Sequence, residues 1–119
     1  MTQAVRFVVS ITIHDGKYDE FETIARAMAE ATAQEDGAVA YEFFISPDKK
    51  RCRLYEEYRD AAAAFAHLSG RVVGELVPQA LGVADLDSFE LLGDPGPDVI
   101  GIVSGFGART FGHLHGVSA

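Results

Sequence analysis

The chain has 119 residues, which is enough for one domain with a sizeable core and too few for two. Hydrophobic residues account for 48% of the sequence and charged residues for 24%, a balance that excludes a disordered or fibrous protein. The formal net charge of −8 opposes binding to nucleic acid or to an anionic membrane surface, because both are polyanions.

The first half of the chain predicts a strand, a helix and a hairpin. Residues 5–13 alternate with a period of two and are rich in β-branched side chains, which indicates a strand. Residues 18–34 carry an apolar stripe at spacings of three and four, typical of a helix, and Gly37 is a natural C-terminal cap. Residues 39–45 and 52–59 alternate again, and the short turn between them predicts a β-hairpin.

The second half predicts more helix and a last strand. Asp60 is a suitable N-cap for an alanine-rich helix at 61–68, and a further helical piece is expected at 71–80. Residues 86–92 predict the fourth strand. The order strand, helix, strand, strand, helix, strand is that of an α+β ferredoxin-like fold, in which a four-stranded antiparallel sheet carries its helices on one face.

The sheet face opposite the helices is predicted to be apolar. The pattern places Val8, Phe44 and Tyr55 there, together with Leu86 or Leu92. Large apolar patches are rarely left in water, and burying one is worth on the order of 25 cal/mol per Å². We therefore expect a homodimer in which this face meets a second copy.

The composition changes after Gly93. We divide the chain into a domain at residues 1–93 and a Gly-rich C-terminal extension at residues 94–119. The extension is apolar enough to require a docking surface, yet its glycines argue against a stable helix. We expect it to pack on the domain or on the partner subunit, with a frayed tail as the alternative.

Cysteine and histidine usage limits the metal chemistry. Cys52 is the lone cysteine, which excludes an intrachain disulfide and a cysteine-based zinc site. His113 and His115 form a His-x-His pair, but in a Gly-rich extension we expect no metal site there. Without a signal-peptide pattern or the roughly 20 apolar residues of a membrane span, we expect a cytoplasmic protein that does not bind membranes.

Two titratable residues are candidates for acid–base chemistry. His67 lies at the end of the 61–68 helix, and an imidazole can move a proton to or from a phenolic or enolic substrate. Glu56 lies on the strand face beneath the helices, where a carboxyl group must be paired, hydrogen-bonded or protonated. The alternatives are a structural helix-end histidine, and a carboxylate that pairs with Arg26 or with backbone amides.

Aromatic residues are expected near these two groups. Tyr41 and Tyr58 can stack on a planar substrate and donate a hydrogen bond. Phe43 and Phe65 can line the same cavity. Filling of the hydrophobic core is the alternative for all four.

The most specific stretch runs from the third strand into the next helix. It reads Leu54-Tyr55-Glu56-Glu57-Tyr58-Arg59-Asp60, followed by an alanine-rich segment that ends in His67-Leu68, and Glu35-Asp36-Gly37 with Tyr41 precedes it. Over about residues 5–93 these motifs resemble the antibiotic biosynthesis monooxygenase superfamily, which includes quinol monooxygenase-like proteins. The family pattern has Trp where this chain has Tyr58, and Val9 stands nearest to an Asn of some catalytic members.

The resemblance implies a dimeric α+β barrel and a cofactor-independent monooxygenase that oxidises a small phenolic or quinol-like substrate with dioxygen. His67 or Glu56 then removes a proton, and neither a metal nor another cofactor takes part. The substrate-binding residues in this interpretation are Tyr58, Tyr41, Phe43, Phe65 and Val9. Two alternatives stay open: an isomerase or degradative enzyme for a small carbonyl metabolite, and a non-catalytic metabolite-binding protein.

Overall fold

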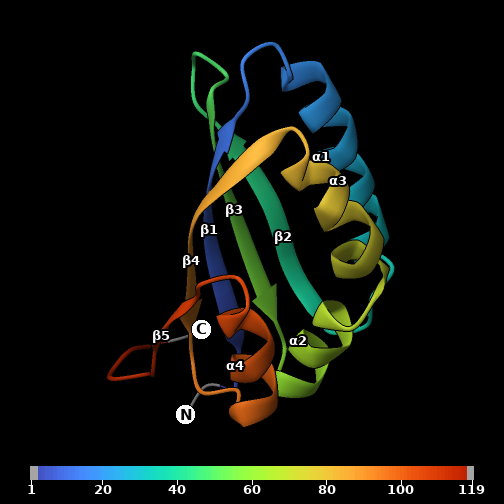
Figure 1. The fold of residues 1–119 in the computed structure, drawn as a ribbon. Coiled ribbons are helices and arrows are strands. Elements are labelled where there is room, and N and C mark those ends of the chain that lie inside the picture. Colours follow the sequence, from blue (N-terminus) through green and yellow to red (C-terminus); the bar gives the residue numbers. More distant parts are fainter. Residues whose placement is uncertain (1–2, 118–119) are drawn as a thin grey trace.

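The computed structural model describes residues 3–117 and has the predicted order of elements as far as β4, followed by a helix and a short strand that were not predicted (Figure 1). In chain order these are β1 (Val5–Ile13), α1 (Tyr18–Thr32), β2 (Ala38–Ile45), β3 (Arg51–Tyr58), α2 (Ala61–Leu68), the π-helical turn η1 (Val72–Leu76), α3 (Val77–Leu81), β4 (Ala84–Leu92), α4 (Pro97–Ser104) and β5 (Arg109–Phe111). The α+β ferredoxin-like class is confirmed, because β1, the β2–β3 hairpin and β4 alternate with helices as predicted.

The sheet is mixed rather than purely antiparallel. Within the described residues its order is β2-β3-β1-β4-β5, and β1 pairs antiparallel with both β3 and β4. The predicted four-stranded sheet lacked β5, which lies parallel to β4 with Glu90 opposite Arg109. The chain reaches this edge because the extension turns back along β4, where the Gly93 amide donates to the Phe111 carbonyl at 2.9 Å.

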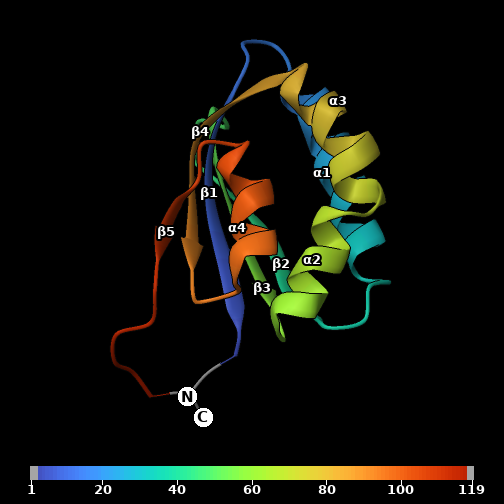
Figure 2. The ribbon, with the colours of Figure 1, turned by 60° about the horizontal axis from the view of Figure 1, so that its bottom comes forward.

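The extension contains a helix, so the expectation that its glycines prevent one was wrong. Pro97 stands in the first turn of α4, where a backbone N–H would have no partner within the helix, so the proline costs no hydrogen bond. Val99 and Val103 lie one turn apart, and both are buried in the main core with Phe7 and Leu91. Figure 2 shows α4 beside α2, on the side of the sheet that carries the helices. Burial of the two valines offsets the low helix propensity of Gly101.

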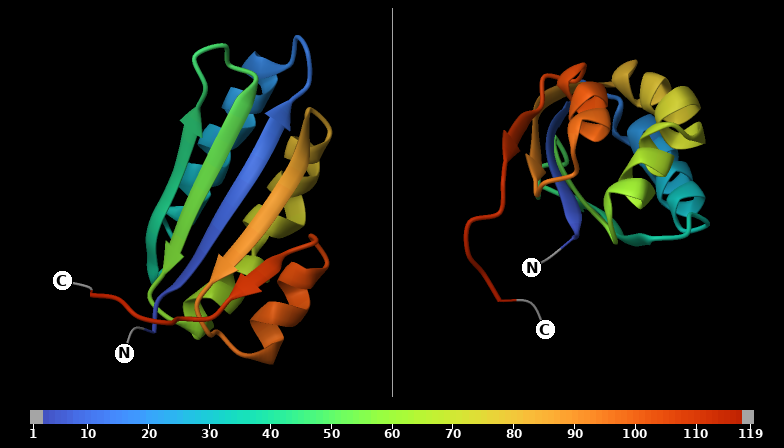
Figure 3. Two further views of the ribbon diagram at one scale, coloured as in Figure 1. Left: turned by 90° about the vertical axis from the view of Figure 1, so that its left-hand side faces the viewer. Right: turned by 90° about the horizontal axis from the view of Figure 1, so that it is seen from below.

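All the described helices lie on one side of the sheet, and its other face is open (Figure 3). The open face carries Phe44, whose surface is 54% exposed. Leu92 pairs with Arg6 on this face, but Leu86 points inward because the β1–β4 register shifts between Ser10 and Ile11. None of the described helices combines the length and hydropathy needed to cross a membrane.

The loop between α1 and β2 is pressed against α2. Helix α1 ends at Thr32, so Gly37 is not its cap but a loop residue with a φ of +87°. A Cβ on Gly37 would lie 2.6 Å from the Cβ of Ala63, and the Gly37 carbonyl accepts from the Arg59 amide at 2.8 Å. This close approach brings residues 33–37 alongside α2.

Replacing Gly37 tests how tightly this loop is held. We expect Gly37→Ala to lower the free energy of unfolding by more than Gly16→Ala. Both positions have positive φ, but nothing lies within 4 Å of a Cβ built on Gly16. The left-handed conformation costs alanine about 1–2 kcal/mol at either site. The clash with Ala63 adds to this only at Gly37, so equal losses in urea unfolding would contradict the packing described.

Candidate active site

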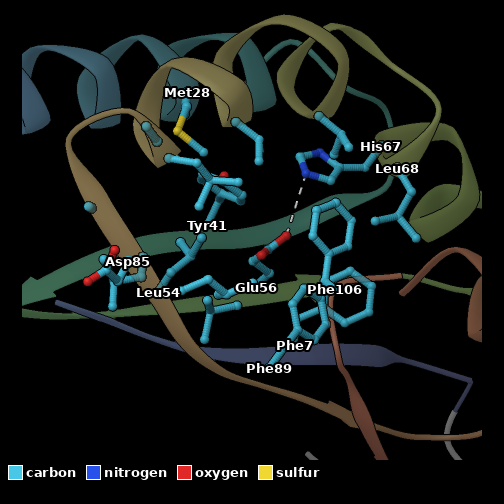
Figure 4. Close-up of a pocket in the computed structure, with 18 of the residues that line it drawn as sticks. Phe7, Met28, Tyr41, Leu54, Glu56, His67, Leu68, Asp85, Phe89 and Phe106 are labelled. Carbon is cyan, nitrogen blue, oxygen red and sulfur yellow. Dashed lines mark ion pairs between the residues drawn. The ribbon is translucent and has the colours of Figure 1, made fainter. Parts of the chain in front are cut away.

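A cavity of about 80 Å³ lies between the inner sheet face and the helices (Figure 4). Only four of the side chains that line it are polar, namely Tyr41, Glu56, His67 and Asp85. The walls are otherwise apolar and come from α1, α2, η1, α3, the sheet and Phe106, which lies two residues after the end of α4. An apolar cavity of about 150 Å³ holds one benzene ring, so a ring-bearing substrate requires these walls to part.

Glu56 is the buried carboxyl group of this cavity. The alternation of β3 turns it inward beside its cross-strand neighbours Phe7 and Tyr41, and its side chain is 6% exposed. The Tyr58 hydroxyl donates to Oε1 of Glu56 at 2.5 Å. Burial raises the pKa of Glu56 to about 8, against the opposing effect of the Tyr58 hydrogen bond, and the charge of Glu35 adds to the rise. The carboxyl group is therefore mostly protonated at neutral pH.

The second oxygen of Glu56 faces the cavity. Tyr58 and His67 both approach Oε1, whereas Oε2 has no hydrogen-bond partner within residues 3–117. No fully buried side-chain nitrogen or oxygen of the described residues lacks a partner, so Oε2 is accessible from the cavity. Figure 4 shows this oxygen directed away from the imidazole. A substrate in the cavity meets Glu56 at this atom.

His67 links the cavity to the chain after α1. Asp60 starts α2 by accepting from the Ala63 amide at 2.9 Å, as predicted, and the last turn of the helix then carries His67. Its Nδ1 lies 2.8 Å from Oε1 of Glu35, and its Nε2 lies 3.5 Å from Oε1 of Glu56. Burial lowers the pKa of His67, with Glu35 opposing the shift, so the imidazole is neutral at pH 7. Because a carboxylate only accepts, we assign the proton to Nδ1.

The two tyrosines occupy different positions relative to the cavity. Tyr58 is fully buried beneath Glu56 and does not line the cavity, but its hydroxyl holds the Glu56 carboxyl group and its ring packs against the His67 ring at 5.0 Å. Tyr41 lines the cavity, and its hydroxyl has no hydrogen-bond partner among the described residues. Burial raises the pKa of Tyr41 well above its usual value, and the charges of Glu56 and Glu35 add to the shift. Tyr41 is thus a neutral donor available to a ligand.

Of the three remaining predicted site residues, one lines the cavity, one lies beside it and one lies away from it. Val9 lines the cavity. Phe43 packs edge-on against Phe21 of α1, with ring centroids 6.2 Å apart, and lies beside the cavity. Phe65 is 43% exposed and does not reach the cavity. It stands two residues before His67, about 200° around the helix, so the two side chains leave α2 on opposite sides.

The alternative partners considered for Glu56 and the extension histidines lie elsewhere. Arg26 pairs with Glu22 on the outside of α1, with Nη2 to Oε1 at 2.6 Å, and makes no contact with Glu56. His113 and His115 are exposed. Among residues 3–117 no three His, Cys, Asp or Glu side chains gather as a metal site.

Two residues near the catalytic candidates were not predicted. Glu35 reaches His67 across 32 positions of sequence, and its only sequence signal is the Glu-Asp-Gly turn motif. Phe106 comes from the extension and stacks on Phe89, with centroids 6.0 Å apart and planes at 13°. Figure 4 shows both rings with Phe7 at one end of the cavity, and Asp85 at the other.

Solved structures share this fold at low sequence identity. MupZ from Pseudomonas fluorescens has a TM-score of 0.86 at 19% identity, with 99% of this chain and 96% of that chain covered. SnoaB, a cofactor-independent oxygenase from Streptomyces nogalater, has a TM-score of 0.68 at 20% identity, with 76% and 91% covered. A putative antibiotic biosynthesis monooxygenase from Nitrosomonas europaea has a TM-score of 0.67 at 18% identity, with 76% and 88% covered.

Sequence comparison places the chain in a family. No curated protein sequence is significantly similar to it. The family described as antibiotic biosynthesis monooxygenase matches residues 4–78, a span that contains Glu35, Glu56 and His67 and more than half of the sequence. The chain belongs to the antibiotic biosynthesis monooxygenase family.

Proposed function

We propose that the chain is a cofactor-independent monooxygenase that oxidises a small phenolic or quinol-like substrate with dioxygen. The observation that carries this proposal is the proton-transfer pair of Glu56 and His67, buried in an otherwise apolar cavity with Oε2 of Glu56 facing the ligand space. Membership of the family and the shared fold with SnoaB support the oxygenase chemistry.

The cavity offers binding groups suited to a planar substrate. The rings of Phe7, Phe89 and Phe106 form one wall, with Phe7 and Phe89 centroids 5.1 Å apart. An aromatic substrate stacks on this wall and points an oxygen towards Glu56 and the Tyr41 hydroxyl.

The proposed reaction begins with proton removal from the substrate hydroxyl by ionised Glu56, with His67 as the next base. The resulting anion is a stronger reductant than the neutral quinol and gives its electrons to dioxygen. One oxygen atom forms a bond to the ring carbon, and the other leaves as water, so a quinol and dioxygen give a hydroxyquinone and water. The apolar walls keep bulk water from the oxygenated intermediate.

A second candidate function uses the same groups without dioxygen. Because the pKa of Glu56 is about 8, the protonated acid predominates at neutral pH and can donate a proton to a small carbonyl metabolite. This observation favours an acid-catalysed isomerisation or degradation.

We further propose that the active form is a homodimer. Phe44 is exposed on the open face of the sheet, where alternation also places the half-buried Val8 and Tyr55, and no described helix covers that face. A second copy that covers it removes this apolar surface from water. In the same proposal, the end of the extension at β5 contacts the partner subunit.

Oxygen uptake with a panel of hydroquinones tests the proposed reaction. We expect Glu56→Gln and His67→Asn each to lower the rate by about 10²-fold or more, the usual contribution of a positioned acid or base. Glu57→Gln is the matched control, because Glu57 lies on the same strand but pairs outward with Arg6 at 3.3 Å. His113→Asn is the exposed histidine control. A rate that survives in both site variants would refute the proposal.

The pH dependence separates the two candidate functions. If ionised Glu56 acts as the base, log(kcat/KM) rises with pH and levels off above about pH 8. If protonated Glu56 acts as the acid, log(kcat/KM) is level at neutral pH and falls above about pH 8. Product analysis without dioxygen completes the test, because only the oxygenase stops.

Truncation of Phe106 tests the binding wall. We expect Phe106→Ala to enlarge the cavity and to lower KM for two-ring relative to one-ring quinols by about tenfold, the lower end of the discrimination that a hydrophobic pocket achieves on substrate size. Phe111→Ala is the control, because Phe111 lies exposed on β5. An unchanged ratio of the two KM values in Phe106→Ala would show that the ring does not limit the substrate.

A further inference from the structure

Glu35 has no role in the reaction described so far, yet it contacts the buried pair of Glu56 and His67 through the histidine. Tyr58, Glu56, His67 and Glu35 follow one another through contacts of 2.5, 3.5 and 2.8 Å. The side chains of Glu56 and His67 are 6% and 3% exposed, whereas that of Glu35 is 26% exposed. Glu35 is therefore the member of this series of contacting side chains that is most exposed to solvent.

The position of Glu35 is fixed by its loop rather than by chance contact. Its amide donates to the Thr32 carbonyl at 2.9 Å, which continues the turn of α1. Two residues later, Gly37 packs against Ala63 of α2, four residues before His67. The loop is thus attached to the helix whose histidine Glu35 contacts.

The charges around His67 are all acidic or neutral. Glu35 faces it from the loop after α1, Glu56 and Tyr58 from β3, and Tyr41 from β2, with ring centroids of Tyr58 and Tyr41 at 5.0 and 5.4 Å. Among the described residues no Arg or Lys forms an ion pair with Glu35, Glu56 or His67. An imidazolium formed here is stabilised by carboxylates on both ring nitrogens.

We propose that Glu35 is a positioning residue that holds His67 with Nδ1 protonated and Nε2 towards Glu56, and that it connects this buried pair to solvent. This inference rests on the proposed acid–base function of Glu56. Without such a connection, a carboxyl group enclosed by apolar walls exchanges its proton only through the substrate or by opening of the fold.

The proton balance of the route is simple. Outward, rotation of the Glu56 carboxyl group turns the proton that it took from the substrate towards His67. Glu56 then gives this proton to Nε2 of His67, the imidazolium gives its Nδ1 proton to Glu35, and Glu35 releases it to water. The inward route is the reverse and restores the first tautomer, so a cycle that takes one proton and returns one leaves His67 unchanged. The 3.5 Å contact to Glu56 must shorten for transfer, and it does so when opposite charges form on the two groups.

Long-range ¹H–¹⁵N correlation spectra of His67 test the positioning without any substrate. In the wild type we expect a protonated Nδ1 and an unprotonated Nε2 at neutral pH. Glu35→Ala removes the acceptor, so the imidazole shifts towards the Nε2-protonated tautomer and titrates at lower pH. Glu35→Gln keeps an acceptor oxygen and restores the first tautomer. Asp36→Ala is the control, because Asp36 lies in the same loop and pairs only with Arg59, at 3.7 Å.

A turnover measurement tests the connection to solvent separately. With a substrate found in the oxygen-uptake or anaerobic assays, Glu35→Gln should lower kcat by about tenfold while KM stays unchanged, because the amide holds the imidazole but carries no proton. An unchanged tautomer in Glu35→Ala would overturn the positioning role, and an unchanged kcat in Glu35→Gln would overturn the proton route. The tautomer spectra need no substrate, so they test the role of Glu35 even if no hydroquinone is oxidised. A failure of the proposed function is therefore distinguishable from a failure of this inference.

Discussion

The protonated carboxyl group of Glu56, enclosed by apolar side chains and held by the Tyr58 hydroxyl, is the feature on which the site depends. Ionising a carboxyl group in such surroundings is costly, so the folded chain binds its proton more tightly than the unfolded chain does. The folded pKa is raised, and the stability linked to this group is therefore lost as pH rises from about 4.5 to about 8. A buried group that lowers stability in this way is a candidate for a chemical role, which is the role we propose for Glu56.

The C-terminal extension completes the cavity that surrounds this group. Val99 and Val103 join the main core, and Phe106 stacks on Phe89 at the cavity wall. The family match ends at residue 78, before the extension begins, whereas the MupZ match covers 99% of the chain and so includes most of it. The proposed acid–base pair thus comes from the part of the chain that matches the family, and part of the proposed substrate wall comes from the extension.

Local periodicity predicts the elements and the inward direction of Glu56, because alternation along β3 places Leu54, Glu56 and Tyr58 on one face. It also brings His67 onto the correct helix. Local sequence patterns do not predict how one helix, strand or loop packs against another. The contact between Glu35 and His67 depends on how the loop at Gly37 packs against α2, and Leu86 turns inward because of a register shift. Helix α4 forms because Val99 and Val103 pack into a core made of residues distant in the sequence.

Infrared difference spectra of the wild type and Glu56→Gln, titrated from about pH 5 to about pH 10, test the central claim most directly. The carbonyl stretch of a protonated carboxylic acid reports Glu56 alone in this difference. The account predicts a band that is present at neutral pH and disappears with a midpoint near pH 8. A band that is already lost near pH 4.5, the ordinary value for glutamate, would mean that Glu56 is an ionised residue in contact with water.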